Sequence, residues 1–198
     1  MDKKNQRKII ISLCGGTGAW EDPYRQHPDI YDVRLITLPE FDVRDYEPPD
    51  GVYGILAAPP CTEFSIARST AKTPRDLQGA MEIVSACLRI IWECQYDDHR
   101  LKFWAIENPT GILRRFLGRP RYQYRHNNFG ERVYKPTDIW GFFNEPQVSS
   151  IPLFVPQYSD GSAKKYACPK QACRKLTRAA RRAITPAGFA RAFFKANQ

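Results

Sequence analysis

The sequence predicts an α/β fold with a mostly parallel sheet, and two observations support this prediction. Short apolar runs typical of buried strands alternate with segments of helical periodicity. Three groups of chemically distinctive residues directly follow such runs, and functional residues gather at the carboxyl ends of strands in these sheets. With 198 residues, the chain has room for one substantial hydrophobic core and is short for two. We therefore expect one domain over residues 1–198.

The first part of the chain predicts three strands. Lys8–Leu13 is a short apolar run that leads into a glycine-rich turn, Cys14-Gly15-Gly16-Thr17-Gly18. Similar runs predict strands at Val33–Leu38 and at Gly54–Ala58. The glycines let the backbone bend sharply and approach a ligand closely. Their spacing is neither that of a dinucleotide fingerprint nor that of a P-loop.

The middle of the chain predicts a long helix followed by another strand. Residues 76–96 form the helix, with apolar side chains at helical spacing: Leu77, Ala80, Met81, Val84, Leu88, Ile91 and Trp92. We expect Cys87 and Cys94 to pack in the core from this helix. A short buried strand, Phe103–Ile106, then ends at Glu107-Asn108-Pro109.

The last part of the chain predicts an irregular insertion and a terminal helix. The pattern weakens from Ser149 to Lys165, which contains Pro152, Pro156, Gly161 and several polar residues. Ala187–Ala196 then reads as an amphipathic helix. Thr185 is the expected N-cap, with Pro186 at the first helical position.

The formal net charge is +9, and the positive residues are clustered. Five arginines lie between Arg114 and Arg125, and a second basic group lies between Lys164 and Arg182. Such groups favour nucleic-acid binding, although charge alone fits a solvated surface equally well. No run of about 18 apolar residues predicts a membrane span. Since the apolar stretch Ile9–Cys14 is short for a signal peptide, we expect a cytoplasmic protein.

Six cysteines could indicate disulfides or a metal site. Without a secretory context, we expect no disulfides. Cys168 and Cys173 have four residues between them, but a structural zinc ion needs four ligands and only His126 is near in sequence. We therefore predict no metal site.

Ala58-Pro59-Pro60-Cys61, followed by Phe64-Ser65, is a more specific pattern. Two prolines after a buried strand hold the cysteine on a stiff turn, where a thiolate can face a pocket. Taken alone, a cysteine is more often a small buried side chain. Glu107 also follows a predicted strand, and its carboxylate could bind a nucleobase, donate a proton or cap a turn.

Taken in order, the three groups resemble the signature of the C5-cytosine DNA methyltransferase family. That signature has a Phe-x-Gly-x-Gly loop, a Pro-Cys turn with a downstream Phe-Ser, and a Glu-Asn-Val strand end. In this chain Cys14 replaces the Phe of the loop, and Pro109 replaces the Val. Lys135 and Thr137 match the family's Arg-x-Arg positions, and residues 184–190 resemble its last conserved element.

The chain departs from the family pattern at three places. The acidic residue that holds the ribose after the second strand is absent, and Ala183 stands where an asparagine is expected. A large target-recognition domain is also missing, and a short irregular insertion at about 141–182 takes its place. Small relatives of the kind found in phage genomes resemble the chain better. The resemblance implies a Rossmann-like S-adenosylmethionine-dependent methyltransferase fold.

The resemblance also implies a role for each matching position. The catalytic residues would be Cys61, Glu107 and Asn108. The residues that bind S-adenosylmethionine would be Cys14, Gly16, Thr17, Gly18, Asp42, Val43, Pro60 and Thr185. The contacts to DNA would come from Ser65, Arg125, Lys135, Arg174, Lys175, Arg178, Arg181 and Arg182.

The implied reaction transfers a methyl group from S-adenosylmethionine to C5 of cytosine in DNA, through a covalent bond between Cys61 and C6 of the base. Two alternatives stay open. The missing recognition domain favours a related enzyme that modifies a pyrimidine in single-stranded DNA, RNA or a nucleotide. A methyltransferase that has lost its activity could serve as a DNA-binding subunit, although the presence of Cys61 and Glu107 argues against this. An additional protein partner could supply target recognition.

Overall fold

The computed structural model describes residues 6–66, 68, 71–97, 101–131, 134–148 and 183–198. Its strands are β1 (Lys8–Leu13), β2 (Tyr31–Ile36), β3 (Val52–Ala57), β4 (Phe103–Pro109), β5 (Tyr122–Arg125) and β6 (Pro136–Phe142). Its helices are α1 (Asp22–Arg25), α2 (Leu77–Asp97), α3 (Arg114–Leu117), the 3₁₀ helix η3 (His126–Phe129) and α5 (Ala187–Ala196).

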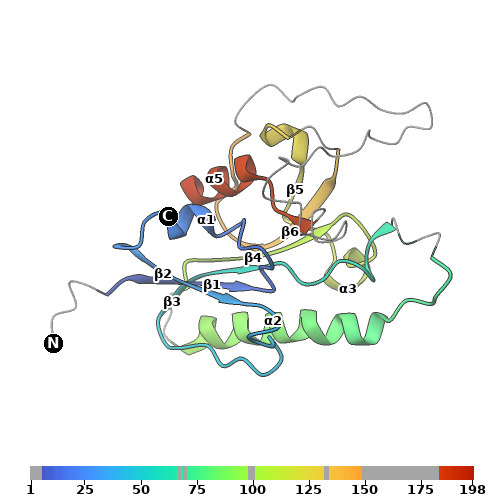
Figure 1. Cartoon of the computed structure of the whole chain (residues 1–198), viewed down its shortest axis with the longest axis horizontal. Coiled ribbons are helices and arrows are strands. Elements are labelled where there is room, and N and C mark those ends of the chain that lie inside the picture. The colour runs from blue at the N-terminus through green and yellow to red at the C-terminus, as the bar shows by residue number, and fades with distance from the viewer. Residues whose placement is uncertain (1–5, 67, 69–70, 98–100, 132–133, 149–182) are drawn as a thin grey trace.

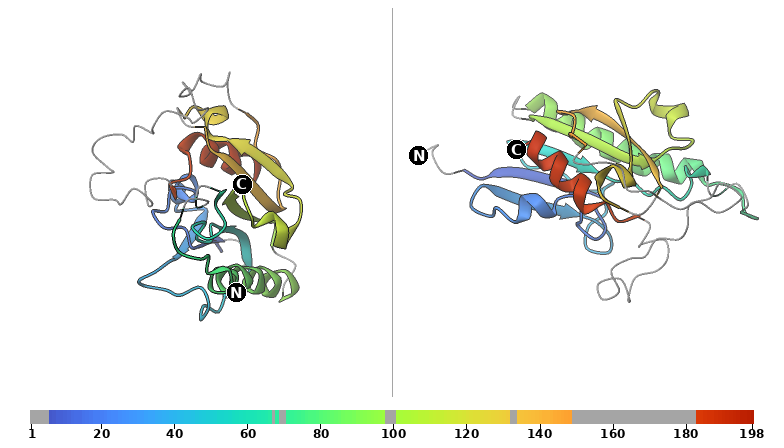
Figure 2. Two further views of the ribbon diagram at one scale, coloured as in Figure 1. Left: turned by 90° about the vertical axis from the view of Figure 1, so that its right-hand side faces the viewer. Right: turned by 90° about the horizontal axis from the view of Figure 1, so that it is seen from above.

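The six strands form one sheet in the order β2-β1-β3-β4-β6-β5. The first four strands in this order are parallel, while β6 runs antiparallel to both β4 and β5. Helix α2 covers one face of the sheet, and α1 and α5 lie on the other (Figures 1 and 2). The predicted α/β class with a mostly parallel sheet is therefore confirmed, and the arrangement is Rossmann-like.

Most element boundaries agree with the sequence prediction to within two residues. Strand β1 and helix α5 have the predicted bounds, and β2 lies two residues earlier than expected. Strand β4 is longer than predicted. It continues through Pro109 because residues 104–109 pair with the antiparallel strand β6. Glu107 and Asn108 are therefore strand residues whose side chains point to opposite faces of the sheet.

A hydrophobic cluster lies on each face of the sheet. Under α2, Ile11, Leu13 and Ile55 from the strands pack with Cys87 and Ile90 of the helix. The predicted core positions of Cys87 and Cys94 are confirmed. Each fully buried Ile or Leu side chain contributes roughly 1.5–3 kcal/mol to stability, so this cluster fixes α2 on the sheet.

The cluster on the opposite face is rich in aromatic side chains. Phe189 and Phe193 of α5 are fully buried, and the ring of Phe189 stacks on that of Tyr124 with 3.9 Å between centroids. Tyr24 and Phe103 belong to the same cluster. The terminal helix thereby closes the core over β1, β4 and β5.

Asn197 fastens the end of α5. Its side-chain oxygen accepts a hydrogen bond from the backbone N–H of Asn144 at 2.8 Å, and its amide donates to the carbonyl of Asn144 at 2.9 Å. At the other end, the prediction that Thr185 caps the helix is wrong. Pro186 occupies the N-cap with ψ near 131°, and no side chain caps the helix. An extended Pro186 lies outside the helix, which therefore begins at Ala187.

Among the described residues, no helix combines the length and the apolar character that crossing a membrane requires.

Candidate active site

The three groups of distinctive residues meet at one edge of the sheet. They follow or end β1, β3 and β4, which are adjacent in the strand order. The backbone N–H of Ala58 donates to the carbonyl of Leu13 at 2.9 Å and joins the ends of β1 and β3. The chain passes from β1 to β2 on one side and then to β3 on the other. The edge beside β1 and β3 is thus the switch point at which doubly wound sheets bind ligands.

The glycine loop after β1 is a tight turn built from left-handed backbone. Cys14, Gly16 and Gly18 have φ values of 55°, 57° and 76°. The N–H of Gly18 donates to the carbonyl of Gly15 at 3.0 Å. A Cβ at Gly15 would collide with Ser12 Oγ, whereas a Cβ at Gly16 would meet nothing within 4 Å. Gly16 therefore leaves open space in which a ligand can approach the backbone.

A buried carboxylate that sequence reasoning missed lies beside this loop. Glu21 is fully buried, and its Oε1 accepts a bond from Arg25 at 3.3 Å. No described residue bonds to its Oε2. Burial raises the pKa of Glu21, while hydrogen bonds, including one from Ser12, and the charge of Arg25 lower it. Because Gly15 and Gly18 have no Cβ, the carboxylate can pack against their backbone.

The turn after β3 presents Cys61 at the same edge. Cys61 is half-buried, and its carbonyl accepts hydrogen bonds from the N–H groups of Phe64 and Ser65 at 3.1 and 2.9 Å. Phe64 is fully buried and anchors the turn in a small hydrophobic cluster. Its carbonyl accepts the N–H of Ile112 at 2.9 Å. The turn is thereby tied both to the core and to the segment that follows β4.

The end of β4 bonds directly to the Cys61 turn. The side-chain amide of Asn108 donates to the carbonyl of Pro59 at 3.0 Å, and Asn108 is fully buried. The side-chain oxygen of Asn108, Oδ1, has no hydrogen-bond partner among the described residues. The neighbouring Glu107 is also buried. Burial raises the pKa of its carboxyl, and the charge of Lys135 opposes that shift.

Tyr124 of β5 lies near Glu107, and it belongs to a group of polar side chains with His126 of η3 and Thr137 of β6. Tyr124 is buried, and burial raises the pKa of its phenol, with the charge of Glu107 adding to the shift. Thr137 hydrogen-bonds to Tyr124 and lies 3.4 Å from Nε2 of His126. Burial, aided by the charge of Lys135, holds the pKa of His126 well below its usual value. The positive charge that acts on Glu107 comes from Lys135.

Among the predicted cofactor residues, Cys14, Asp42 and Val43 lie near one another. Val43 is buried with Leu13 in the cluster that Cys14 also contacts, so the segment after β2 lies against the glycine loop. A hydrogen bond with Cys87 lowers the pKa of the Cys14 thiol, while burial and the charge of Asp42 raise it. The Asp42 carboxylate is engaged by Arg44 at 2.6 Å, which lowers its pKa to about 2.

The remaining predicted positions are more dispersed. Thr185 is half-buried just before α5, and Pro60 is exposed beside Cys61. Ser65 forms an isolated bridge with Gly111. Arg125 is exposed, and its guanidinium lies over the ring of Tyr134 at 4.9 Å. The other predicted DNA contacts lie outside the described residues: Arg174, Lys175, Arg178, Arg181 and Arg182.

Cys168 and Cys173 also lie outside the described part of the chain. Within that part, no three His, Cys, Asp or Glu side chains gather where they could hold a metal ion.

The sequence matches no known protein-family model, and it matches no curated protein. Among solved structures it is similar to the Entamoeba histolytica methyltransferase EhMeth, with a TM-score of 0.36 at 9% identity over 82% of this chain and 58% of that chain. It is also similar to the structure described as the DhpI-SAM-HEP complex, with a TM-score of 0.30 at 12% identity over 71% and 65% of the two chains. The chain therefore spans less than two thirds of each. At these scores neither similarity identifies a family, and the fold class rests on the strand order and directions.

Proposed function

We propose that this protein is an S-adenosylmethionine-dependent methyltransferase that methylates C5 of cytosine in DNA. The observation that carries the proposal is the hydrogen bond from Asn108 to the carbonyl of Pro59. It joins the strand end that holds Glu107 to the turn that holds Cys61, beside the glycine loop. A nucleophile and a buried acid are thus held at neighbouring strand ends, as the proposed reaction requires.

The glycine loop fits S-adenosylmethionine because it offers exposed backbone at the switch point of the sheet. Gly16 has a positive φ and open space where a Cβ would stand. The methionine part of this cofactor carries an ammonium group, and the carboxyl group of Glu21 beside the loop has an oxygen, Oε2, that could accept a hydrogen bond from it. When bound, the cofactor supplies an electrophilic methyl group on a sulfonium.

Cys61 would act as the nucleophile on the base. Its thiolate forms a bond from Sγ to C6 of cytosine, which makes C5 electron-rich enough to take the methyl group. The C5 proton then leaves to water, the Sγ–C6 bond breaks, and the aromatic ring is restored. The thiolate is the reactive form, and half-burial leaves Cys61 accessible to a base.

Glu107 would bind the Watson–Crick edge of the cytosine. Its raised pKa favours the protonated carboxyl, which can donate a hydrogen bond to N3 as negative charge develops on the ring. Asn108 would hold the Cys61 turn against this strand end. A base in a duplex must leave its stack to reach these groups, at a cost of roughly a few kcal/mol.

DNA that contains 5-fluorocytosine tests the proposed chemistry. Fluorine cannot leave C5 as a proton does, so the bond between Cys61 and C6 should persist after methyl transfer. We expect a denaturation-resistant adduct that needs S-adenosylmethionine and that peptide mapping assigns to Cys61. Cys61→Ser should form none, because a hydroxyl is far less ionised than a thiol. An adduct at another residue would contradict the assignment.

The same experiment distinguishes the proposed function from two other candidate functions. The stretch between β6 and α5 is short for a target-recognition domain, which favours a substrate that is already unpaired. Single-stranded DNA and RNA that carry the same fluorinated base should then react faster than duplex. A DNA-binding subunit without activity would bind all three and form no adduct. Any protein partner for target recognition would act on the duplex reaction alone.

A further inference from the structure

Two cysteines from distant parts of the chain contact each other beside the glycine loop. Cys14 is the first residue of the loop, and Cys87 lies in the middle of α2. Their thiols hydrogen-bond to each other. Cys87 belongs to the hydrophobic cluster under α2, and Cys14 packs against that cluster. No disulfide joins the two residues in this structure. The contact therefore links the candidate cofactor loop to α2 through two groups that oxidation can join covalently.

The two thiols differ in acidity, and this difference assigns their roles. The hydrogen bond with Cys87 lowers the pKa of the Cys14 thiol, against the opposing effects of burial and of the Asp42 charge. The same hydrogen bond, together with burial, raises the pKa of Cys87. Cys14 therefore ionises first, while Cys87 keeps its proton and donates it to the sulfur of Cys14. The thiolate is the form that an oxidant attacks.

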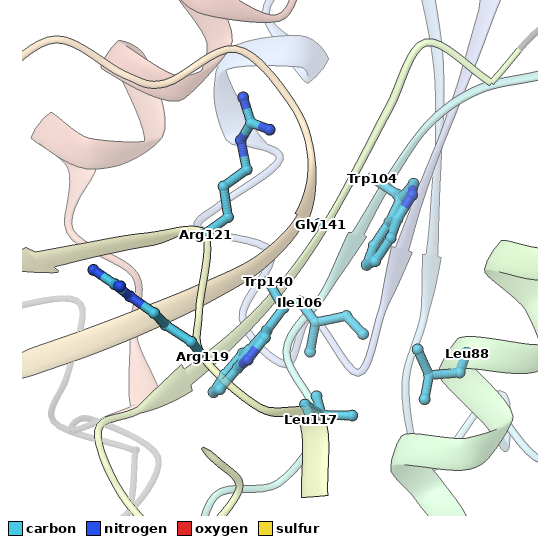
Figure 3. A pocket seen from close by; sticks show the side chains of 8 residues that line it. All are labelled: Leu88, Trp104, Ile106, Leu117, Arg119, Arg121, Trp140 and Gly141. Atoms are coloured by element: carbon cyan, nitrogen blue, oxygen red, sulfur yellow. The ribbon is translucent and has the colours of Figure 1, made fainter.

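Cys14 is also the more accessible of the two. It is half-buried, and the neighbouring Gly16 and Thr17 are exposed, whereas Cys87 is fully buried. The hollow of about 330 Å³ beside Leu88, the residue after Cys87, is lined by neither cysteine (Figure 3). A small oxidant therefore reaches the pair from the side of the glycine loop.

A covalent bond between these residues would change the position of the loop. Cys14 lies in a left-handed turn with φ near 55°, and its N–H donates to the carbonyl of Ile36 at 2.7 Å. Cys87 is held by the buried cluster that fixes α2 on the sheet. Since a disulfide holds its sulfur atoms about 2 Å apart, closer than hydrogen-bonded thiols, the turn has to shift toward α2. Gly16, which leaves the space for a ligand, would move with it.

We propose that Cys14 and Cys87 form a reversible redox pair, in which hydrogen peroxide joins them as a disulfide and thereby weakens ligand binding at the glycine loop. That this ligand is S-adenosylmethionine rests on the proposed function, whereas formation of the disulfide does not.

The oxidation proceeds in two balanced steps. The Cys14 thiolate attacks one oxygen of the peroxide, the O–O bond breaks, and the released hydroxide takes the proton that Cys14 gave up, which leaves a sulfenic acid on Cys14. The sulfur of Cys87 then attacks the sulfur of Cys14. The S–S bond forms, the S–O bond breaks, and the hydroxyl group leaves as water with the proton of Cys87. Overall, two thiols give two electrons to one peroxide, which becomes two molecules of water.

Peptide mapping and calorimetry together test this proposal. Wild-type protein treated with hydrogen peroxide would be alkylated and digested without reductant, and its affinity for S-adenosylmethionine would be measured before oxidation, after it, and after dithiothreitol. We expect peptides joined through Cys14 and Cys87, an affinity about tenfold lower, and full recovery with dithiothreitol. Because coupling is reciprocal, saturating S-adenosylmethionine should shift the thiol–disulfide equilibrium in a glutathione buffer about tenfold toward the thiols.

The matched control is Cys94→Ser, because Cys94 is also buried in the cluster under α2. This variant should keep the response to peroxide, whereas Cys87→Ser and Cys14→Ser should each lose it. Cys61 is present in all three variants, so its oxidation cannot account for the difference. A disulfide between other residues, or an unchanged affinity in protein that carries the Cys14–Cys87 bond, would overturn the proposal. Failure of the reduced protein to bind S-adenosylmethionine would instead contradict the proposed function, and the mapped disulfide would still stand.

Discussion

The side-chain amide of Asn108 reaches the carbonyl oxygen of Pro59 at 3.0 Å, and neither residue exposes much surface to solvent. The two residues are 49 positions apart in the chain. This bond holds the end of β4 against the turn that presents Cys61. The bond therefore helps to fix the position of Glu107 relative to Cys61 at this edge of the sheet.

Replacing Asn108 by alanine should slow methyl transfer at least tenfold, because the Cys61 turn loses its link to β4. The unpaired carbonyl of Pro59 should also cost about 1–3 kcal/mol of stability. The affinity for S-adenosylmethionine should change little. Asn144→Ala is the control, since it removes an amide-to-carbonyl bond to Ala196, far along the chain from this turn. Equal losses of activity in both variants would show that Asn108 acts through stability alone.

Glu107 should make the stability of the protein depend on pH. Its pKa is raised above the ordinary value of 4.5, mainly by burial. The stability that it contributes is therefore complete below pH 4.5 and is lost as the pH rises through the raised pKa. Urea unfolding of the wild type and of Glu107→Gln should show the variant gaining relative stability toward alkaline pH. A difference that does not vary with pH would mean that Glu107 is not desolvated.

Replacing Gly16 should weaken cofactor binding by more than the strain of a left-handed residue explains. Gly16→Ala places a side chain in left-handed conformation, at a cost of about 1–2 kcal/mol, and fills the open space at the loop. Gly130→Ala is a matched control, because Gly130 also has a positive φ and open space around its Cβ position. Calorimetric titration should show a loss of S-adenosylmethionine affinity in Gly16→Ala only. Similar affinities in the two variants would exclude the loop as the binding site.

The ion pair between Arg114 and Asp138 should stabilise the β4–β6 end of the sheet. Asp138 is fully buried and accepts two bonds of 2.6 Å from Arg114. Arg114→Ala should cost about 2–3 kcal/mol, below the loss for a wholly buried pair because Arg114 is 39% exposed. Arg115→Ala, at the exposed neighbouring position, should stay within about 0.5 kcal/mol of the wild type. Chemical denaturation measures both, and a neutral Arg114→Ala would be contrary to expectation.

Elements with strong local signals were predictable from the sequence. Strand β1, helix α2 and helix α5 have continuous apolar runs or clear helical periodicity. Helices α1 and α3 have four residues each, which is too short for a periodicity. Strand β5 lies within the arginine-rich segment and was not predicted. Its alternation of Tyr122 and Tyr124 with polar residues is a strand pattern that charge clustering obscured.

The candidate site was predictable only in part, for a physical reason. The glycine loop, Cys61 and Glu107 carry local patterns, and the parallel sheet brings strand ends together. The burial of Glu21 and His126 depends on side chains from distant segments. No local pattern marks a buried carboxylate that follows a glycine loop by three residues.

Nucleoside mass spectrometry of methylated DNA tests the central claim most directly. Wild-type protein and Cys61→Ser would each be incubated with S-adenosylmethionine carrying a labelled methyl group and with single-stranded or duplex DNA, which is then digested to nucleosides. We predict labelled 5-methylcytosine from the wild type and none from Cys61→Ser. Label on another atom, equal transfer by the variant, or no transfer by a wild-type protein that binds the cofactor would contradict C5 methylation through Cys61.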